Sequence, residues 1–209
     1  MLTLHLARHG ETDAAARGYY AGDIDPPLIE AGIEQARRLA ASVATLGLDA
    51  LYVSPKLRAR MTMEPIEQAT GLTAEIEPGL KEIGYGRWEG VSEAEARSMD
   101  PQLHAAWTAD PAMTSPPGGE TAFDIVSRAM PVIQRIRERH PHGHVLVVSH
   151  KATIRVLTCA LLGLYVGRFR DRIACPTSSV TTFAFGPRGP MLMRHADVAH
   201  LGVGRRAGG

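Results

Sequence analysis

Short apolar runs that end in polar residues recur along the chain, and each one predicts a buried strand. Such runs occupy residues 2–7, 51–53 and 144–148. The run at 144–148, His-Val-Leu-Val-Val, is almost continuously apolar, as is typical of a strand that is covered on both faces. Two further strands are predicted near 179–185 and 190–196, where they would close the sheet.

Between these runs, apolar residues recur at the spacing of amphipathic helices. The predicted helices span residues 29–46, 57–70, 92–99, 120–139 and 152–163. Ser92 and Glu95 form a capping-box pattern at the start of the third helix. Since strand-like and helix-like segments alternate, the chain is expected to form an α/β fold with a mostly parallel sheet.

Three details of this pattern can be checked against a structure. Pro131 predicts a kink or a break inside the helix at 120–139, and Phe123 and Val126 are expected on its inward face. Met191 and Met193 alternate as in a strand and are expected in the core. Residues 108–119, with three prolines and two glycines, predict a loop.

Length and composition narrow the class of protein. The 209 residues are 44% hydrophobic and 22% charged, with a formal net charge of +1. We expect one domain over residues 1–201, followed by a disordered Gly- and Arg-rich tail at 202–209. The near-neutral charge gives no indication of binding to nucleic acid or to a membrane surface.

Three further features predict a cytoplasmic protein. Cys159 and Cys175 are too few for a disulfide framework, so free thiols are expected. No positively charged and then apolar leader precedes the first strand, so no secretory signal is expected. No apolar stretch approaches the roughly 18–20 residues that span a bilayer.

Chemically active side chains follow the predicted strands. Arg8 and His9 follow the first strand, Arg58 lies near the start of the helix after the second, and His150 follows the strand at 144–148. In an open α/β sheet, ligands bind beyond the carboxyl ends of the strands. An imidazole beside a guanidinium there suits the binding and nucleophilic attack of a phosphate.

Five sequence blocks resemble the histidine phosphatase superfamily, the phosphoglycerate-mutase-like proteins. The blocks are Arg8-His9-Gly10-Glu11-Thr12, Ser54 to Ala59, Leu80 to Ile83 with Gly86 to Gly90, Gly118-Gly119-Glu120, and Val147 to His150. They occur in the family's order over residues 1 to about 200. The resemblance implies a three-layer α/β/α fold and a phosphatase that uses neither a metal nor a cofactor. Residues 18–36 resemble α-ribazole phosphatases and related small phosphatases.

The residues and the resemblance together predict a mechanism. Arg8 and Arg58 disfavour the protonated form of His9, so its imidazole should be neutral and nucleophilic in the empty site. Its second ring nitrogen needs an acceptor, for which a backbone carbonyl in the His9–Gly10 turn is expected. By resemblance, Arg8, Arg58 and His150 hold the phosphoryl group. By the same resemblance, Glu82 would donate a proton to the leaving group, and we expect it in a low-dielectric position.

Several assignments have alternatives. Arg60 could take the place of Arg58, and Glu89 that of Glu82. The basic run at 168–172 is either solvated or part of an entrance for an acidic substrate. His140, His142 and His144 look like a metal cluster in composition, but an exposed loop is favoured.

Substrate-binding roles are expected for four residues: Thr12 as a hydroxyl donor, Tyr20, Gly22 and Lys151. Lys151 stands where family members often have Gly, and indicates either a second anionic group on the substrate or a surface lysine. Two positions depart from the family pattern. Ala15 stands where Asn is common, and Tyr19 where Arg is common, so Arg17 is considered as a replacement phosphate donor.

The leading function is hydrolysis of a small cytosolic phosphomonoester through a phosphohistidine on His9. A cofactor-dependent phosphoglycerate mutase is the close alternative, but Glu82 and Gly118 are only 36 positions apart and leave no room for the mutase insertion. A phospho-ligand-binding module without activity, suggested by Ala15, and a protein phosphohistidine phosphatase remain open. The expected partner is the small substrate, without nucleic acid or membrane, and a homodimer is left open.

Overall fold

The computed structural model describes residues 1–202, and the tail expected beyond them lies outside the described residues. The six strands are β1 (Leu2–Arg8), β2 (Ala50–Val53), β3 (Ala74–Ile76), β4 (Gly143–Ser149), β5 (Val180–Gly186) and β6 (Gly189–Asp197). The α-helices are α1 (Asp13–Arg17), α2 (Glu30–Val43), α3 (Leu57–Thr70), α4 (Glu93–Met99), α5 (Pro101–Ala109), α6 (Ala122–Arg139), α7 (Lys151–Leu161) and α8 (Phe169–Arg172). Short 3₁₀ turns lie at Ala44–Leu46, Pro78–Leu80, Gly86–Trp88, Val166–Arg168 and Ala199–Leu201.

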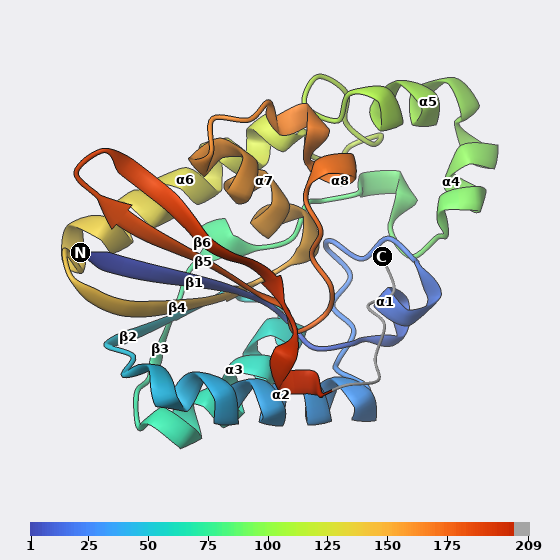
Figure 1. Ribbon diagram of the computed structural model, residues 1–209. Helices are drawn as coiled ribbons and strands as arrows, with labels where there is room; N and C mark the ends of the chain where they lie inside the picture. Colours follow the sequence, from blue (N-terminus) through green and yellow to red (C-terminus); the bar gives the residue numbers. More distant parts are fainter. Residues whose placement is uncertain (203–209) are drawn as a thin grey trace.

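The strands form one sheet in the order β3-β2-β4-β1-β5-β6. The first four strands in this order pair in parallel, and β5 and β6 continue the sheet in antiparallel pairing. Helices α6 and α7 cover one face, and α2 and α3 cover the other (Figure 1). The predicted α/β/α fold with a mostly parallel sheet is therefore confirmed.

Alternating residues of the central strand β4 supply two separate cores. Val145 and Val147 belong to the cluster that contains the apolar residues of α6 and α7. Leu146 and Val148 belong to the cluster that contains those of α2 and α3. All four side chains are fully buried, which explains why this strand reads as a continuous apolar run.

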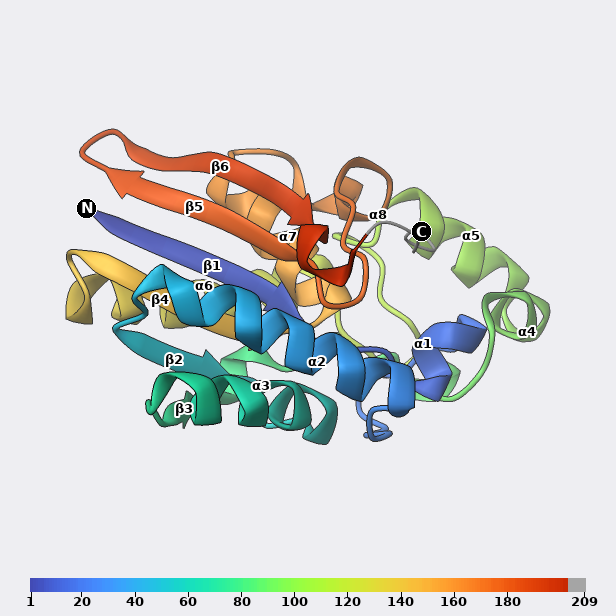
Figure 2. The same cartoon turned by 60° about the horizontal axis from the view of Figure 1, so that its bottom comes forward.

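A third, smaller cluster lies beyond the end of the sheet. It consists of Trp88, Ala96 and Trp107, with Tyr20 and Tyr85 packed against it. Helices α4 and α5, which contribute to it, lie beyond the end toward which the β1 and β2 arrows point (Figure 2). The capping box of Ser92 and Glu95 that was predicted at the start of α4 is present.

Two expectations about packing are wrong, and of the kink or break predicted at Pro131 the break is absent. Helix α6 runs without interruption through Pro131. Phe123 is 46% exposed, because the buried stripe of α6 follows Ile125, Ala129 and Ile136 instead. Met191 and Met193 are 61% and 59% exposed, because β6 is an edge strand.

Within residues 1–202, none of the helices is long and apolar enough to cross a membrane. Cys159 and Cys175 are both free and buried. Burial raises the pKa of the Cys159 thiol to about 11 and also raises that of Cys175.

Candidate active site

The register of two neighbouring parallel strands brings His9 and His150 together. Arg8 at the end of β1 pairs with Ser149 at the end of β4. The residue after each is a histidine, and the backbone N–H of His9 donates to the Ser149 carbonyl at 3.0 Å. The two rings consequently lie with their centroids 5.1 Å apart and their planes inclined by 57°.

The contacts of His9 identify its tautomer. Its Nδ1 lies 2.7 Å from the Gly10 carbonyl oxygen, so Nδ1–H donates to the expected backbone acceptor and Nε2 keeps its lone pair. Burial, followed by the charges of Arg8 and Arg58, holds the pKa of His9 well below 6.5. The direction of this pKa agrees with the neutral imidazole expected from the sequence, and burial contributes more to it than the arginines do.

His150 caps the N-terminus of α7 and is also fully buried. Its Nε2 lies 2.6 Å from Ser54 Oγ, and its Nδ1 is buried without a partner. Burial and the neighbouring His9 lower the pKa of His150 well below 6.5. Ser54 follows β2, and the sequence reading assigned it no role.

Backbone carbonyls of the loop at 21–24 hold the Arg58 guanidinium. Arg58 donates to the Ala21 oxygen at 2.9 Å, to the Ile24 oxygen at 3.0 Å and to Asp25 Oδ1 at 3.2 Å. Its side chain is 2% exposed, whereas Arg60, the alternative from the sequence, is exposed. Arg58 is therefore the arginine of α3 that reaches His9.

Arg8 approaches His9 from the end of β1. One of its terminal nitrogens donates to the Cys175 carbonyl at 2.7 Å, while its Nε is buried without a partner. The arginine is 7% exposed. Arg8 and Arg58 together place two largely buried guanidinium groups beside one neutral imidazole, which suits a tetrahedral oxyanion.

Glu82 is buried against the N-terminus of α7. Its carboxylate accepts from the backbone N–H of Ile83 at 2.9 Å, of Ala152 at 3.2 Å and of Thr153 at 3.3 Å. The Glu82 side chain lines the same cavity as His9 and Arg58. Glu82 is only 5% exposed, so the expected buried position is observed.

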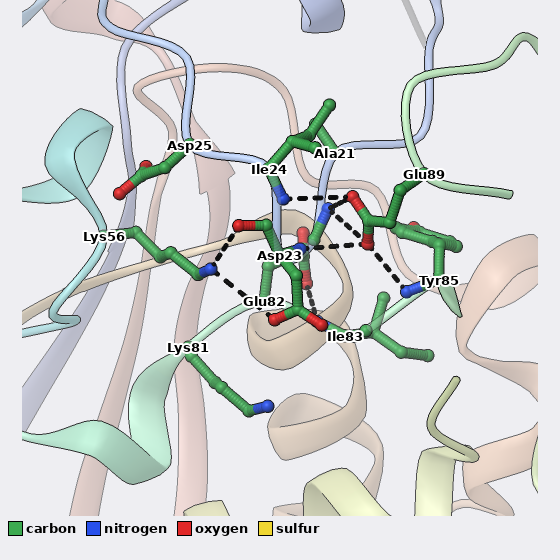
Figure 3. Close-up of polar contacts among 12 residues, drawn as sticks. Ala21, Asp23, Ile24, Asp25, Lys56, Lys81, Glu82, Ile83, Tyr85 and Glu89 are labelled. Carbon is green, nitrogen blue, oxygen red and sulfur yellow. Dashed lines mark hydrogen bonds and ion pairs between the residues drawn. The ribbon is translucent and has the colours of Figure 1, made fainter. Parts of the chain in front are cut away.

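Glu89, the alternative to Glu82, binds backbone N–H groups of the loop at 21–24 instead. Its carboxylate accepts from the backbone N–H groups of Gly22, Asp23, Ile24 and Tyr85, at distances between 2.8 and 3.2 Å (Figure 3). Glu89 does not line the cavity around His9.

Two adjoining cavities open onto these groups. The inner cavity, about 70 Å³, is lined by Arg8, His9, Thr12, Ala15, Tyr19, Ala21, Arg58, Glu82, Tyr85 and Lys151. The outer cavity, about 250 Å³, is lined by Arg8, Ala15, Gly18, Tyr19, Tyr20, Tyr85, Glu93, Trp107, Lys151, Ala152, Arg155, Phe169 and Arg170. Several residues line both, so the two cavities lie side by side.

The four expected substrate-binding residues fall in different places. Thr12 lines the inner cavity, although its hydroxyl accepts from the Ala15 N–H at 3.1 Å. Lys151 lines both cavities, and Tyr20 lines the outer one. Gly22 lines neither, and its backbone N–H is bound by Glu89.

Arg17 does not replace the phosphate donor that is missing at Ala15. Arg17 is 62% exposed, forms an ion pair with Asp13 at 2.9 Å and lines neither cavity. Ala15 itself lines both cavities.

The outer cavity contains Arg155 and Tyr85, which the sequence did not single out, and Arg170, for whose basic run an entrance was one of two alternatives. Arg155 is one helical turn after Lys151 on α7, a spacing that could have revealed it. Arg170 comes from the basic run at 168–172 and lies over the Trp107 ring, 4.0 Å from its centroid. Tyr85 precedes Gly86 within a motif block, but no periodicity marks it.

The three histidines at 140–144 contact separate partners. His140 Nε2 lies 3.0 Å from the Tyr52 hydroxyl, His142 Nδ1 lies 3.2 Å from the N-terminal ammonium, and His144 Nδ1 lies 3.2 Å from His5 Nε2. Across residues 1–202, no group of three or more His, Cys, Asp or Glu side chains is placed to hold a metal ion.

Comparison with known proteins agrees with this geometry. The model of the histidine phosphatase superfamily (branch 1) matches residues 4–198. The chain is 31% identical to phosphoserine phosphatase 1 of Hydrogenobacter thermophilus over 97% of its length and 95% of that protein. It is also 31% identical to the adenosylcobalamin/alpha-ribazole phosphatase of Escherichia coli, over 78% of this chain and 80% of that one.

A solved structure, Bacillus stearothermophilus YhfR, superposes with a TM-score of 0.90 at 30% identity. The match covers 97% of this chain and 100% of that one. The predicted similarity to α-ribazole phosphatases is thus confirmed at the level of sequence.

Proposed function

The chain belongs to the histidine phosphatase superfamily, and from this premise we propose that it hydrolyses a small phosphomonoester through a phosphohistidine on His9. The free Nε2 of a neutral His9, set between two buried arginines, carries the proposal. The phosphatases among its relatives support the reaction class.

The first half-reaction forms the covalent intermediate. The Nε2 lone pair attacks phosphorus while the bond from phosphorus to the ester oxygen breaks. Arg8 and Arg58 bind the non-transferred oxygens and neutralise the charge that spreads over them. Glu82 gives its proton to the departing alkoxide, which leaves as an alcohol.

The second half-reaction returns the enzyme to its starting state. Water attacks the phosphorus of phospho-His9, Glu82 takes the proton of that water, and the phosphorus–nitrogen bond breaks to release inorganic phosphate. Splitting the hydrolysis into two displacements replaces one high barrier with two lower ones.

His150 has a separate part in this scheme. Its ring is neutral in the empty site, where burial and His9 lower its pKa. A dianionic phosphoryl group beside it would favour the imidazolium form, which then donates to a phosphoryl oxygen. Its contact with Ser54 orients the ring for this donation.

Phosphate release from p-nitrophenyl phosphate and a panel of metabolite esters, measured in EDTA, tests the proposal. We expect turnover in the wild type and a loss of about 1000-fold or more in His9→Ala. The exposed His142 supplies a matched control, His142→Ala, which should retain activity. Alkaline quenching and mass spectrometry should find the phosphoryl group on the peptide that contains His9. Turnover that persists in His9→Ala would overturn the proposal.

A further inference from the structure

The outer cavity lies where the leaving group of a substrate must sit. The inner cavity lies around His9, and it adjoins the outer one at Arg8, Tyr85 and Lys151, which line both. A phosphate ester bound with its phosphorus beside His9 therefore extends its organic part into the outer cavity. The residues of that cavity determine which leaving groups are accepted.

Cations dominate the wall of this cavity. Arg8, Lys151, Arg155 and Arg170 line it, against one carboxylate, Glu93. Glu93 is already engaged, with one oxygen 3.7 Å from the Arg170 guanidinium and another 3.5 Å from that of Arg97. Within residues 1–202, Lys151 and Arg155 form no ion pair with a carboxylate.

Several of these cations carry donors with no acceptor. Nε of Arg8, Nε of Arg155 and one terminal nitrogen of Arg170 are buried without a hydrogen-bond partner. A buried donor without an acceptor is destabilising, most of all when its group is charged, so these guanidinium groups have unmet hydrogen-bonding capacity. Together with the excess of cations over carboxylates in the lining, this unmet hydrogen-bonding capacity favours an anionic ligand.

The cavity also fixes the position of Arg170. The guanidinium stacks on the indole of Trp107, and Trp107 packs edge-on against Tyr20 at 5.6 Å between centroids. Tyr20 in turn stacks on Tyr85 at 4.5 Å. A guanidinium stacked on a ring that is itself packed against other rings loses little conformational entropy when it binds an anion.

Burial and the neighbouring cations lower the pKa values of Lys151 and Arg155. Burial, then Arg8 and Arg155, lowers the pKa of Lys151 to about 8. Burial also lowers the pKa of Arg155. A bound anion would relieve both effects, because it favours the charged form of each group.

We propose that the outer cavity binds a second anionic group, a carboxylate or a phosphate on the leaving group of the substrate, through Lys151, Arg155 and Arg170. The inference rests on the proposed phosphatase function and narrows its substrate class to phosphomonoesters with two anionic ends. Of the two alternatives for Lys151, a substrate-binding lysine or a surface lysine, the inference favours the first. It also assigns Arg170, from the basic run, to the entrance for an acidic substrate.

Matched substrate pairs test this assignment. Phosphoserine and phosphoethanolamine differ by one carboxylate, as do 3-phosphoglycerate and glycerol 3-phosphate, while ribose 1,5-bisphosphate and ribose 5-phosphate differ by one phosphate. We expect kcat/KM to be about 10- to 100-fold higher for the member with the second anion in at least one class of pair. Preference in the first two pairs identifies a carboxylate, and preference in the third identifies a phosphate.

Two variants test whether the preference for a second anion depends on Arg155 and Arg170. Arg155→Gln and Arg170→Gln should each reduce the preference about tenfold or more, mainly through KM. Arg172→Gln is the matched control, because Arg172 is exposed on the same short helix as Arg170 and does not line the cavity. A preference that survives in both variants, or equal rates within every pair, would refute the second-anion site while leaving a His9-dependent phosphatase intact.

A binding measurement separates this inference from the proposed function. Calorimetric titration of His9→Ala with 3-phosphoglycerate and with glycerol 3-phosphate requires no turnover. Tighter binding of 3-phosphoglycerate that Arg155→Gln abolishes would support the site even if no ester were hydrolysed. Equal binding of these two esters, and of the two ribose phosphates, would refute the site.

Discussion

Both oxygens of the Glu89 carboxylate accept from the backbone N–H of Gly22, at 3.1 and 3.0 Å. The same carboxylate accepts from Asp23 and Ile24, so one side chain gathers three successive amides of the loop (Figure 3). This loop supplies the carbonyl acceptors of Arg58. Glu89 therefore positions Arg58 without facing His9.

Replacement of Glu89 by Gln should loosen the loop and weaken catalysis. The amide NH₂ cannot accept, and the charge that strengthens the remaining hydrogen bonds is lost. We expect kcat/KM for p-nitrophenyl phosphate to fall about 10- to 100-fold, with faster hydrogen exchange at residues 22–24. Glu138→Gln, at an exposed position of α6, is the control. Unchanged exchange in Glu89→Gln would show that Glu89 does not hold this loop.

The Gly22→Ala substitution should disturb the same region sterically. A Cβ at this position would lie 1.9 Å from the Ile83 carbonyl oxygen, and that oxygen belongs to the backbone directly after Glu82. We expect the midpoint of thermal unfolding to fall by several degrees, together with a loss of activity. At Gly186, a Cβ would meet nothing within 4 Å, so Gly186→Ala should leave both unchanged. Equal effects of the two substitutions would contradict the close approach.

The protonation of His9 can be followed directly by NMR of ¹⁵N-labelled histidine. Burial and two arginines hold its pKa well below 6.5, so its ring should remain neutral, with the proton on Nδ1, at pH 6. The Arg8→Gln variant should raise the titration midpoint, because a cation that opposes protonation is removed. A wild-type midpoint at or above 6.5 would contradict this account of the nucleophile.

His5 should make stability depend on pH. Burial, then His144 and Arg194, lowers its pKa from 6.5 to about 4. The unfolded chain therefore binds a proton that the folded chain excludes, and the stabilisation present above pH 6.5 is lost as the pH falls toward 4. At about 1.4 kcal/mol per pKa unit, the loss is on the order of 3 kcal/mol.

Chemical denaturation at a series of pH values measures this effect. The free energy of unfolding should decline between pH 6.5 and 4 more steeply in the wild type than in His5→Phe. The exposed His142 again offers a control, and His142→Ala should retain the wild-type slope. Parallel slopes in His5→Phe and the wild type would assign the pH dependence to other groups.

The Ala15→Asn substitution should strengthen phosphate binding. Ala15 lines both cavities, and an amide there adds a donor for a phosphoryl oxygen. We expect a several-fold tighter inhibition constant for inorganic phosphate. Ala16→Asn, one position along the same short helix and exposed, is the control. No gain in Ala15→Asn would mean that other groups already saturate the phosphoryl oxygens.

The site residues at the strand ends could be predicted from the sequence, because each one directly follows a clear apolar run. Arg8, His9 and His150 directly follow apolar runs, and parallel pairing of β1 with β4 then requires the two histidines to meet. The capping box at Ser92 is similarly local. For these residues, the spacing along the chain determines the position in space.

The outer cavity could not be predicted in the same way. Trp107 lies on α5, a helix the sequence reading did not identify, and Arg170 lies on the four-residue α8. Their contact depends on how these two short helices pack beyond the sheet, and no periodic pattern encodes that. The exposure of Met191 has the same origin, because alternation alone does not say which strand is at the edge.

The arginines at the centre of the site are held mainly by main-chain oxygens, from Cys175 for Arg8 and from Ala21 and Ile24 for Arg58. A carbonyl is present whatever side chain its residue carries. Substitutions at these three positions can therefore accumulate during divergence without moving the guanidinium groups. Such anchoring separates the chemistry from the choice of substrate, and makes these three positions suitable places to introduce diversity when the enzyme is redesigned for another ester.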